Sequence, residues 1–262
     1  MIPAILLVGL GKMGGAMLAG WQERGLSAAI AVDPTLPNVR GPHVTVVASA
    51  EAIPPDFTPA CVLFAVKPQS ADTVVPLYAR YRNAVMLSIM AGRGIAGLQS
   101  ALGGAAVVRA MPNTPAAIRQ GITVACAGPG VTEIQRRLCD TLLAAVGDVA
   151  WVEDEALIDP VTAISGGGPA YVFLLAELLE KAALAHGLPP DLARLLARRT
   201  VSGSGALLAA SSEDAGVLRQ NVTSPNGTTE RALQVMMAED AWPRAVSAAI
   251  DAATRRSREL RG

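Results

Sequence analysis

Residues 4–8 (AILLV) pass directly into residues 9–14 (GLGKMG), and this stretch decides the fold. The apolar run predicts a buried strand, and the pattern of residues 14–24 predicts a helix right after the glycines. In such a G-x-G-x-x-G turn the first glycine permits the tight turn. The second lets the backbone approach a pyrophosphate, and the third lets helix and strand pack closely. This strand–turn–helix order is typical of dinucleotide binding at a helix N-terminus, and an ordinary glycine-rich turn without a ligand is the alternative.

Short apolar runs recur through the first half of the chain and alternate with helical patterns. Such alternation implies parallel β-α-β units in an open sheet that is covered on both faces. We also expect a hairpin-like pair of strands, 121–127 and 148–152, around a helix at 132–146. The other expected strands are 4–8, 28–32, 44–47, 60–66, 84–89 and 105–109.

The pattern changes near residues 150–160, and no strand is expected beyond them. Residues 169–186 (PAYVFLLAELLEKAALAH) predict a long helix, with a proline near its start and Gly-Leu-Pro after its end. Further helices are expected at 191–208, 228–238 and 242–261. The predicted fold class is therefore α/β, with a Rossmann-type dinucleotide-binding domain at 1–156 and an all-helical domain at 157–262.

Composition excludes several classes of protein. The 262 residues include 22 Lys and Arg against 22 Asp and Glu, which gives no electrostatic reason to expect nucleic acid or a membrane surface. Disorder is excluded because 51% of the residues are hydrophobic and only 17% are charged. Apolar runs are expected to stop short of the ~20 residues that span a bilayer. Cys61, Cys126 and Cys139 have neither metal-ligand nor disulfide spacing, so we expect core thiols, no metal and a cytoplasmic location.

The choice of nicotinamide depends on Asp33, which ends the second expected strand. An acid there accepts a hydrogen bond from a ribose 2′-OH and repels a 2′-phosphate, which favours NAD(H). The nearest following arginine is Arg40. Alternatively, Asp33 and Pro34 form only a turn.

Two further segments follow strands at the edge where open α/β sheets bind ligands. Lys67, one of three lysines, lies in residues 65–68 (AVKP), where it serves either the cofactor or as a solvent-facing charge. Asn113 lies in residues 111–115 (MPNTP), a stiff loop that either lines the nicotinamide site or is a structural crossover turn.

Two segments precede expected helices of the second half. Residues 165–171 (SGGGPAY) allow close approach of a backbone or an anion, and they also fit a hinge between the two halves. Residues 223–229 (TSPNGTT) bring hydroxyls and unpaired N–H groups to a helix start, which suits a small carboxylate. An ordinary N-cap would explain only one of the threonines.

The chain offers no obvious histidine acid. His43 lies in an expected loop, and His186 ends a helix, where capping of carbonyls is its expected role. Hydride delivery to a C=N bond fits this better than oxidation of an alcohol, because an imine can enter already protonated.

Taken together, the sequence resembles the pyrroline-5-carboxylate reductase family through nearly its whole length. The resemblance is carried by the glycine turn, AVKP, 88–92 (SIMAG), 109–116 (RAMPNTPA), 164–171 (ISGGGPAY) and 224–229 (SPNGTT), in the family's order. It implies reduction of 1-pyrroline-5-carboxylate to L-proline by NADPH or NADH. It also implies a helical half that forms an intertwined dimer, often stacked into larger rings of dimers.

The resemblance also implies site residues. Thr229 would hydrogen-bond the ring nitrogen and help to place or supply a proton, which makes it the candidate catalytic residue. The substrate carboxylate would be bound by Val222, Ser224, Gly227, Thr228 and Thr229. The dinucleotide would be bound by Gly9, Leu10, Gly11, Lys12, Met13, Gly14, Asp33, Ala65, Val66, Lys67, Pro68, Ile89, Met90, Ala91 and Gly92.

The chain departs from the family pattern at two positions. Gly167 replaces the middle serine of S-G-S-G-P, and Asn226 replaces the first glycine of P-G-G, where asparagine tolerates the backbone angles of the turn. Two alternative functions remain open. A β-hydroxyacid dehydrogenase would place an asparagine four residues after a helical lysine, but Ala185 follows Lys181 at that spacing. A nucleotide-binding regulatory protein without turnover would bind the cofactor only.

Overall fold

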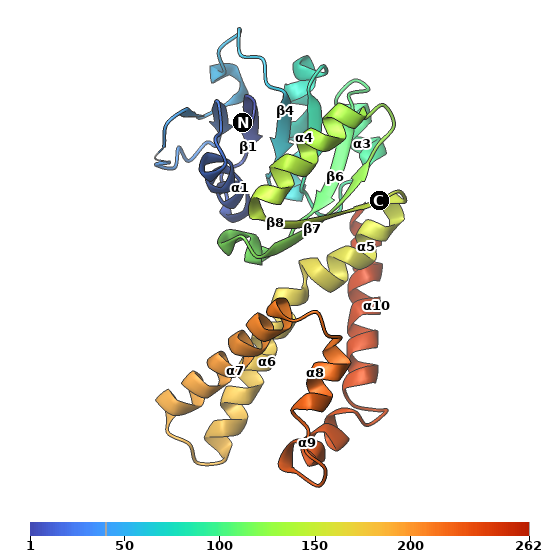
Figure 1. Ribbon diagram of the computed structural model, residues 1–262. Coiled ribbons are helices and arrows are strands. Elements are labelled where there is room, and N and C mark those ends of the chain that lie inside the picture. Colours follow the sequence, from blue (N-terminus) through green and yellow to red (C-terminus); the bar gives the residue numbers. More distant parts are fainter. Residues whose placement is uncertain (40, 262) are drawn as a thin grey trace. The chain divides into compact units, whose positions relative to one another are not determined.

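The computed structural model describes residues 1–39 and 41–261 and divides into two compact units (Figure 1). The first comprises Met1–Gly166 together with residues 253–261, and the second is Gly167–Ala252. The division therefore lies after the expected boundary at 156. The reason is that Ile158 is fully buried in the core of the first unit.

The first unit is built on an eight-stranded sheet of order β3-β2-β1-β4-β5-β6-β7-β8. The strands β1 to β6 are parallel, in the arrangement of a doubly wound dinucleotide-binding sheet. The expected α/β fold is confirmed. The strands are β1 (Ile5–Val8), β2 (Ala29–Val32), β3 (Val44–Val47), β4 (Cys61–Phe64), β5 (Val85–Ser88), β6 (Val107–Met111), β7 (Gly121–Ala127) and β8 (Gly147–Val152).

Helices cover both faces of this sheet because alternate strand residues point to opposite sides. Ile5 and Leu7 of β1 join one core cluster, and Leu6 and Val8 join the other. The first cluster is closed by α1 (Lys12–Glu23) and α4 (Glu133–Leu143), and the indole N–H of Trp21 donates to the Leu142 carbonyl over 2.9 Å. The second is closed by α2 (Ala71–Val74), α3 (Ile95–Ala101), α5 (Ile158–Val161) and the 3-10 helix η3 (Val75–Tyr81).

The expected hairpin of β7 and β8 is wrong. These two strands are parallel to each other, and β7 is antiparallel to β6. The connection explains both directions. The short segment with η4 (Thr114–Ile118) reverses the chain between β6 and β7, whereas α4 forms a crossover that returns the chain to the start of a parallel neighbour.

Among its described residues, the second unit contains helices and the turns that connect them, and no strand. The helices are α6 (Gly168–Ala185), α7 (Pro190–Ala210), α8 (Ala215–Asn221), α9 (Thr228–Met236) and α10 (Trp242–Arg261), whose last residues belong to the first unit. The helix α8 was not predicted from the sequence. The ring Nδ1 of His186 lies 2.9 Å from the Ala182 carbonyl, as expected for a residue at a helix end.

The apolar surface of α6 is unusual for a helix inside a single chain. None of its 18 residues is buried. Among residues 1–39 and 41–261, the helical stretch Glu155–Ala185 is long and apolar enough to cross a membrane by length and composition, and 6% of its apolar window is buried. The expectation that no run reaches this length is therefore corrected. An exposed apolar surface of this kind marks an interaction site with protein or membrane.

Candidate active site

In the glycine turn after β1, Gly9 and Gly14 are closely packed, whereas the space beside Gly11 is open. Gly9 has a φ of +100°, and a Cβ there would lie 2.8 Å from the Ala65 carbonyl oxygen. A Cβ at Gly14 would lie 2.1 Å from the Gly9 carbonyl oxygen, but one at Gly11 would meet no atom within 4 Å. Gly11 is also the N-cap of α1 and provides no side-chain cap. The turn therefore leaves room for a phosphate above the N–H groups of α1, and it fits a dinucleotide.

Asp33 lies beside this turn at the end of β2. Its Oδ2 accepts a hydrogen bond from the Leu10 N–H over 2.9 Å, and its Oδ1 accepts from the N–H and hydroxyl of Thr35 over 2.9 and 2.6 Å. Partial burial raises the pKa of Asp33, but the hydrogen bonds from Thr35 and Leu10 outweigh burial and lower it below the usual value. The carboxylate is therefore charged and fixed. Arg40 lies outside the described residues.

The ends of β4 and β5 meet at the same sheet edge. The Ile89 N–H donates to the Phe64 carbonyl over 3.1 Å, and Lys67 is exposed just beyond β4. Arg93, in the segment after β5, binds the segment after β4. Its Nε and Nη2 donate to the Pro68 carbonyl over 3.0 and 2.8 Å, and its Nη1 donates to Asp72 over 2.7 Å. Arg93 is not among the site residues predicted from the sequence. The only sequence feature that could have indicated it is its position directly after Gly92, the last residue of SIMAG.

Asn113 is anchored by its own side chain. Its Oδ1 accepts a hydrogen bond from the Ile122 N–H over 2.9 Å, which ties the loop after β6 to β7. The loop is also tied to α1, since Arg119 pairs with Glu23 over 2.6 Å. The Asn113 amide N–H₂ can still donate, so both earlier interpretations of this loop, ligand contact and crossover turn, are compatible with the geometry.

The expected substrate loop belongs to the second unit. Asn226 has a φ of +59°, in the left-handed region, and its N–H donates to Glu230 over 2.8 Å. The Gly227 N–H donates to the Ser224 carbonyl over 3.0 Å, and Gly227 caps α9 without a side-chain hydrogen bond. Thr228 and Thr229 form the first turn of α9. The asparagine thus supports the turn where the family has glycine, as expected.

Other chemistries find little support in the described part of the chain. Within residues 1–39 and 41–261, no three His, Cys, Asp or Glu side chains gather as metal ligands. Lys181, the only lysine of the second half, pairs with Glu177 over 2.5 Å on α6. This arrangement gives no help to the dehydrogenase alternative.

Comparison with known proteins identifies the family. The chain is 37% identical to the pyrroline-5-carboxylate reductase of Pseudomonas aeruginosa over 98% of this chain and 97% of that one. It is 33% identical to the enzyme of Pisum sativum, with 97% and 94% of the two chains covered. The chain belongs to the pyrroline-5-carboxylate reductase family.

Solved structures and a domain comparison agree with this assignment. A pyrroline-5-carboxylate reductase from Coxiella burnetii superimposes with a TM-score of 0.88 at 30% identity, covering 98% of each chain. The Plasmodium falciparum pyrroline carboxylate reductase, solved with NADP bound, gives a TM-score of 0.83 at 26% identity and covers 99% of this chain and 98% of that one. Residues 155–260 match the family model for pyrroline-5-carboxylate reductase dimerisation. The resemblance inferred from the motifs is thus confirmed, and the helical part of this family member is of a dimerising type.

Proposed function

We propose that this protein reduces the C=N bond of 1-pyrroline-5-carboxylate to give L-proline. The observation that carries the proposal is the match in sequence and fold to reductases of this name over nearly the whole chain. A reduced nicotinamide dinucleotide, NADPH or NADH, supplies the hydride when it is bound. The reaction then needs one proton at the ring nitrogen.

The dinucleotide would lie along the carboxyl ends of the parallel strands. Gly11 and the open N-terminus of α1 would hold the pyrophosphate, and Asp33 would meet the adenosine ribose. Lys67 would attract the phosphates from the end of β4, and Asn113 would face the nicotinamide. The turn at 89–92 completes this surface. These roles are supported by the closeness of the turns and by the open space at Gly11.

The substrate would be held by its carboxylate. The uncapped start of α9 offers N–H groups and the hydroxyls of Thr228 and Thr229, which suit a small anion. Val222, Ser224 and Gly227 would shape the loop around it. Thr229 would hydrogen-bond the ring nitrogen. Catalysis would then depend mainly on orientation and on the positive end of the helix.

We further propose a cytoplasmic homodimer that can stack into a larger ring of dimers. The three cysteines are free and buried, which suits a reducing compartment. The unburied apolar residues of α6, together with the dimerisation match, support the dimer. Within a dimer the apolar stretch Glu155–Ala185 would face protein rather than lipid.

The decisive experiment follows the absorbance of the reduced nicotinamide with 1-pyrroline-5-carboxylate, in parallel with NADH and NADPH, and identifies proline as the product. Oxidation that requires the imine is the expected result. A protein that binds the dinucleotide but oxidises neither form would contradict the proposal and favour the regulatory alternative.

A further inference from the structure

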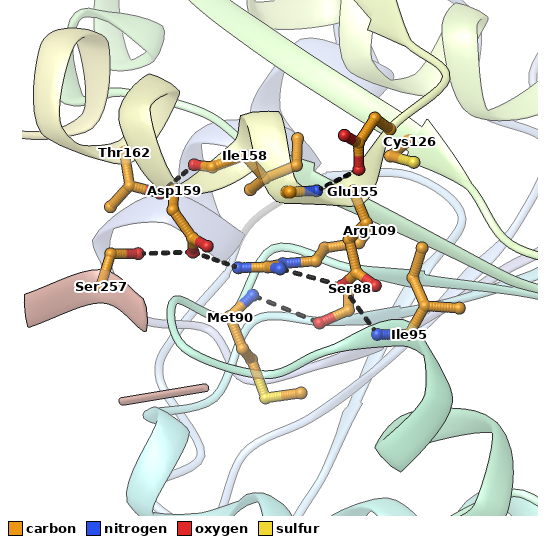
Figure 2. A network of polar contacts seen from close by, with 12 residues as sticks. Ser88, Met90, Ile95, Arg109, Cys126, Glu155, Ile158, Asp159, Thr162 and Ser257 are labelled. Carbon is orange, nitrogen blue, oxygen red and sulfur yellow. Dashed lines mark hydrogen bonds and ion pairs between the residues drawn. The ribbon is translucent and has the colours of Figure 1, made fainter. Parts of the chain in front are cut away.

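An ionic cluster centred on the buried Arg109 lies close to the turn at 89–92 (Figure 2). Arg109 of β6 is fully buried, and its Nη1 donates to Glu155 Oε1 over 2.9 Å. Its Nη2 lies 3.8 Å from Oδ1 of the fully buried Asp159. The same Oδ1 accepts a hydrogen bond from the Ser257 hydroxyl over 2.9 Å. One guanidinium thus connects β6, the segment entering α5, and the last turns of α10.

Each carboxylate of this cluster holds another segment of the chain. Glu155 Oε1 also accepts from the N–H of Ile95, the first residue of α3, over 2.9 Å. Ile95 follows the turn at 89–92 after two residues, Arg93 and Gly94. At the other end of this turn, the Met90 N–H donates to the Ser88 hydroxyl over 3.3 Å, and Ser88 pairs with Arg109 in the register of β5 and β6.

The last turn of α10 lies against the middle of this turn. Gly92 has a φ of +66°, and a Cβ there would lie 2.9 Å from the Leu260 Cβ and 3.1 Å from the Leu260 carbonyl oxygen. Ser257 precedes Leu260 by less than one helical turn. The hydrogen bond from Ser257 to Asp159 therefore fixes the part of α10 that covers Gly92.

Stability alone is a weak explanation for the cluster. Within the described residues, Arg109 Nε and Nη2 have no hydrogen-bond partner although both are buried. Buried ion pairs that leave donors unmatched often add nothing to stability compared with apolar residues of similar volume. A geometric role fits better, because Glu155 accepts a hydrogen bond from the N–H of Ile95 and Asp159 accepts one from Ser257 of α10, and both of these segments lie close to the turn at 89–92.

We propose that Arg109 is a positioning residue for the dinucleotide. Through Glu155 and Ile95 it fixes the end of the turn at 89–92, and through Asp159 and Ser257 it fixes the helix that covers Gly92. This inference rests on the proposed function for the cofactor surface, but it concerns residues that touch neither cofactor nor substrate.

The test compares two substitutions on one helix. Ser257→Ala removes the hydrogen bond to Asp159. Thr254→Ala is the control, because it removes the hydroxyl of another buried residue of α10 that lies outside the cluster. The dissociation constants of NADH and NADPH are measured by fluorescence titration, with KM for the imine, kcat and thermal unfolding alongside. We expect Ser257→Ala to weaken dinucleotide binding about three- to tenfold, with KM for the imine nearly unchanged. Thr254→Ala should leave dinucleotide binding unchanged.

Equal binding changes in the two variants, or none in Ser257→Ala, would overturn the proposal. Asp159→Asn and the pair Arg109→Met and Arg109→Lys extend the series, and the lysine should restore part of the binding if it folds. Because binding is measured without turnover, failure of this inference is distinguishable from failure of the proposed reaction.

Discussion

The carboxylate of Asp33 is tied to the glycine turn, since its Oδ2 accepts a hydrogen bond from the Leu10 N–H over 2.9 Å. The N–H and hydroxyl of Thr35 donate to the other oxygen, Oδ1, so hydrogen bonds fix both oxygens of the carboxylate. Each carboxylate oxygen can accept more than one hydrogen bond, which leaves Oδ2 able to receive a ribose hydroxyl. A fixed negative charge at this place opposes a 2′-phosphate.

We therefore predict a preference for NADH over NADPH that depends on this carboxylate. Asp33→Ser should raise the NADPH-to-NADH ratio of kcat/KM about tenfold or more, because it removes the repulsion. Asp56→Ser, at an exposed carboxylate elsewhere, is the matched control. An unchanged ratio in Asp33→Ser would show that Asp33 only shapes the turn.

The glycine turn gives a second prediction, in which two similar substitutions act differently. A Cβ at Gly11 points into open space, and the φ of −64° suits alanine, so Gly11→Ala should fold with nearly unchanged thermal stability. It should still weaken dinucleotide binding about tenfold, because the new methyl group occupies the phosphate position.

Gly14→Ala should instead destabilise the fold. Its Cβ would lie 2.1 Å from the Gly9 carbonyl oxygen, so helix and turn must separate, at a loss of about 1–3 kcal/mol or more. Thermal unfolding and dinucleotide titration of both variants check this pair of predictions. Equal losses of thermal stability in the two variants would contradict the open space at Gly11, on which its assignment to the phosphate rests.

The proposed role of Thr229 predicts a loss of turnover. Thr229→Ala should lower kcat about 10- to 100-fold, the effect of losing one hydrogen bond to a charged group, while dinucleotide affinity stays unchanged. Thr223→Ala is the control, since the Thr223 hydroxyl already donates to the Arg219 carbonyl over 2.6 Å. Equal turnover in the two variants would remove Thr229 from the active site.

Much of the fold could be predicted from local sequence. The strands β1 to β5 are apolar runs buried on both faces except at the edge strand β3, so they stand out in the sequence. The direction of β8 was not recognised, because strand direction depends on the path of the connection and not on the strand residues. The helix α8 was missed because it has only seven residues and contains Gly216.

The site was predictable where it depends on motifs at strand ends, such as the glycine turn. The supporting contacts were not predictable, because they join residues far apart in the chain. Arg109 was expected to end a strand, and its burial depends on Glu155, which lies 46 residues further along the chain. Arg93 likewise reaches Pro68 across 25 residues. Sequence spacing alone carries no signal for such pairs.

The exposed apolar surface of α6 gives a prediction about assembly. Phe173 is 67% exposed in the single chain, and a dimer would cover it. Phe173→Glu should shift the protein toward monomers in size-exclusion chromatography with light scattering, because burying an unpaired charge is unfavourable. Lys181→Ala on the same helix, which removes an exposed ion pair, should leave the assembly intact. An unchanged dimer in Phe173→Glu would exclude this face.

The last prediction concerns pH and Tyr78, which packs its buried ring edge-on against Phe64 with centroids 5.6 Å apart. Burial, together with the nearby Glu51 carboxylate and Tyr81, raises the pKa of Tyr78 from 10.0 to about 12. The folded state thus favours the neutral phenol. Its contribution to stability is complete below pH 10 and is lost as pH rises from 10 toward 12.

Tyr78→Phe should therefore reduce the alkaline loss of stability by up to about 1 kcal/mol at pH near 11, measured by denaturant unfolding at several pH values. The tyrosinate absorbance of the wild type should exceed that of the variant only near pH 12, and an excess already complete near pH 10 would contradict the burial of this hydroxyl.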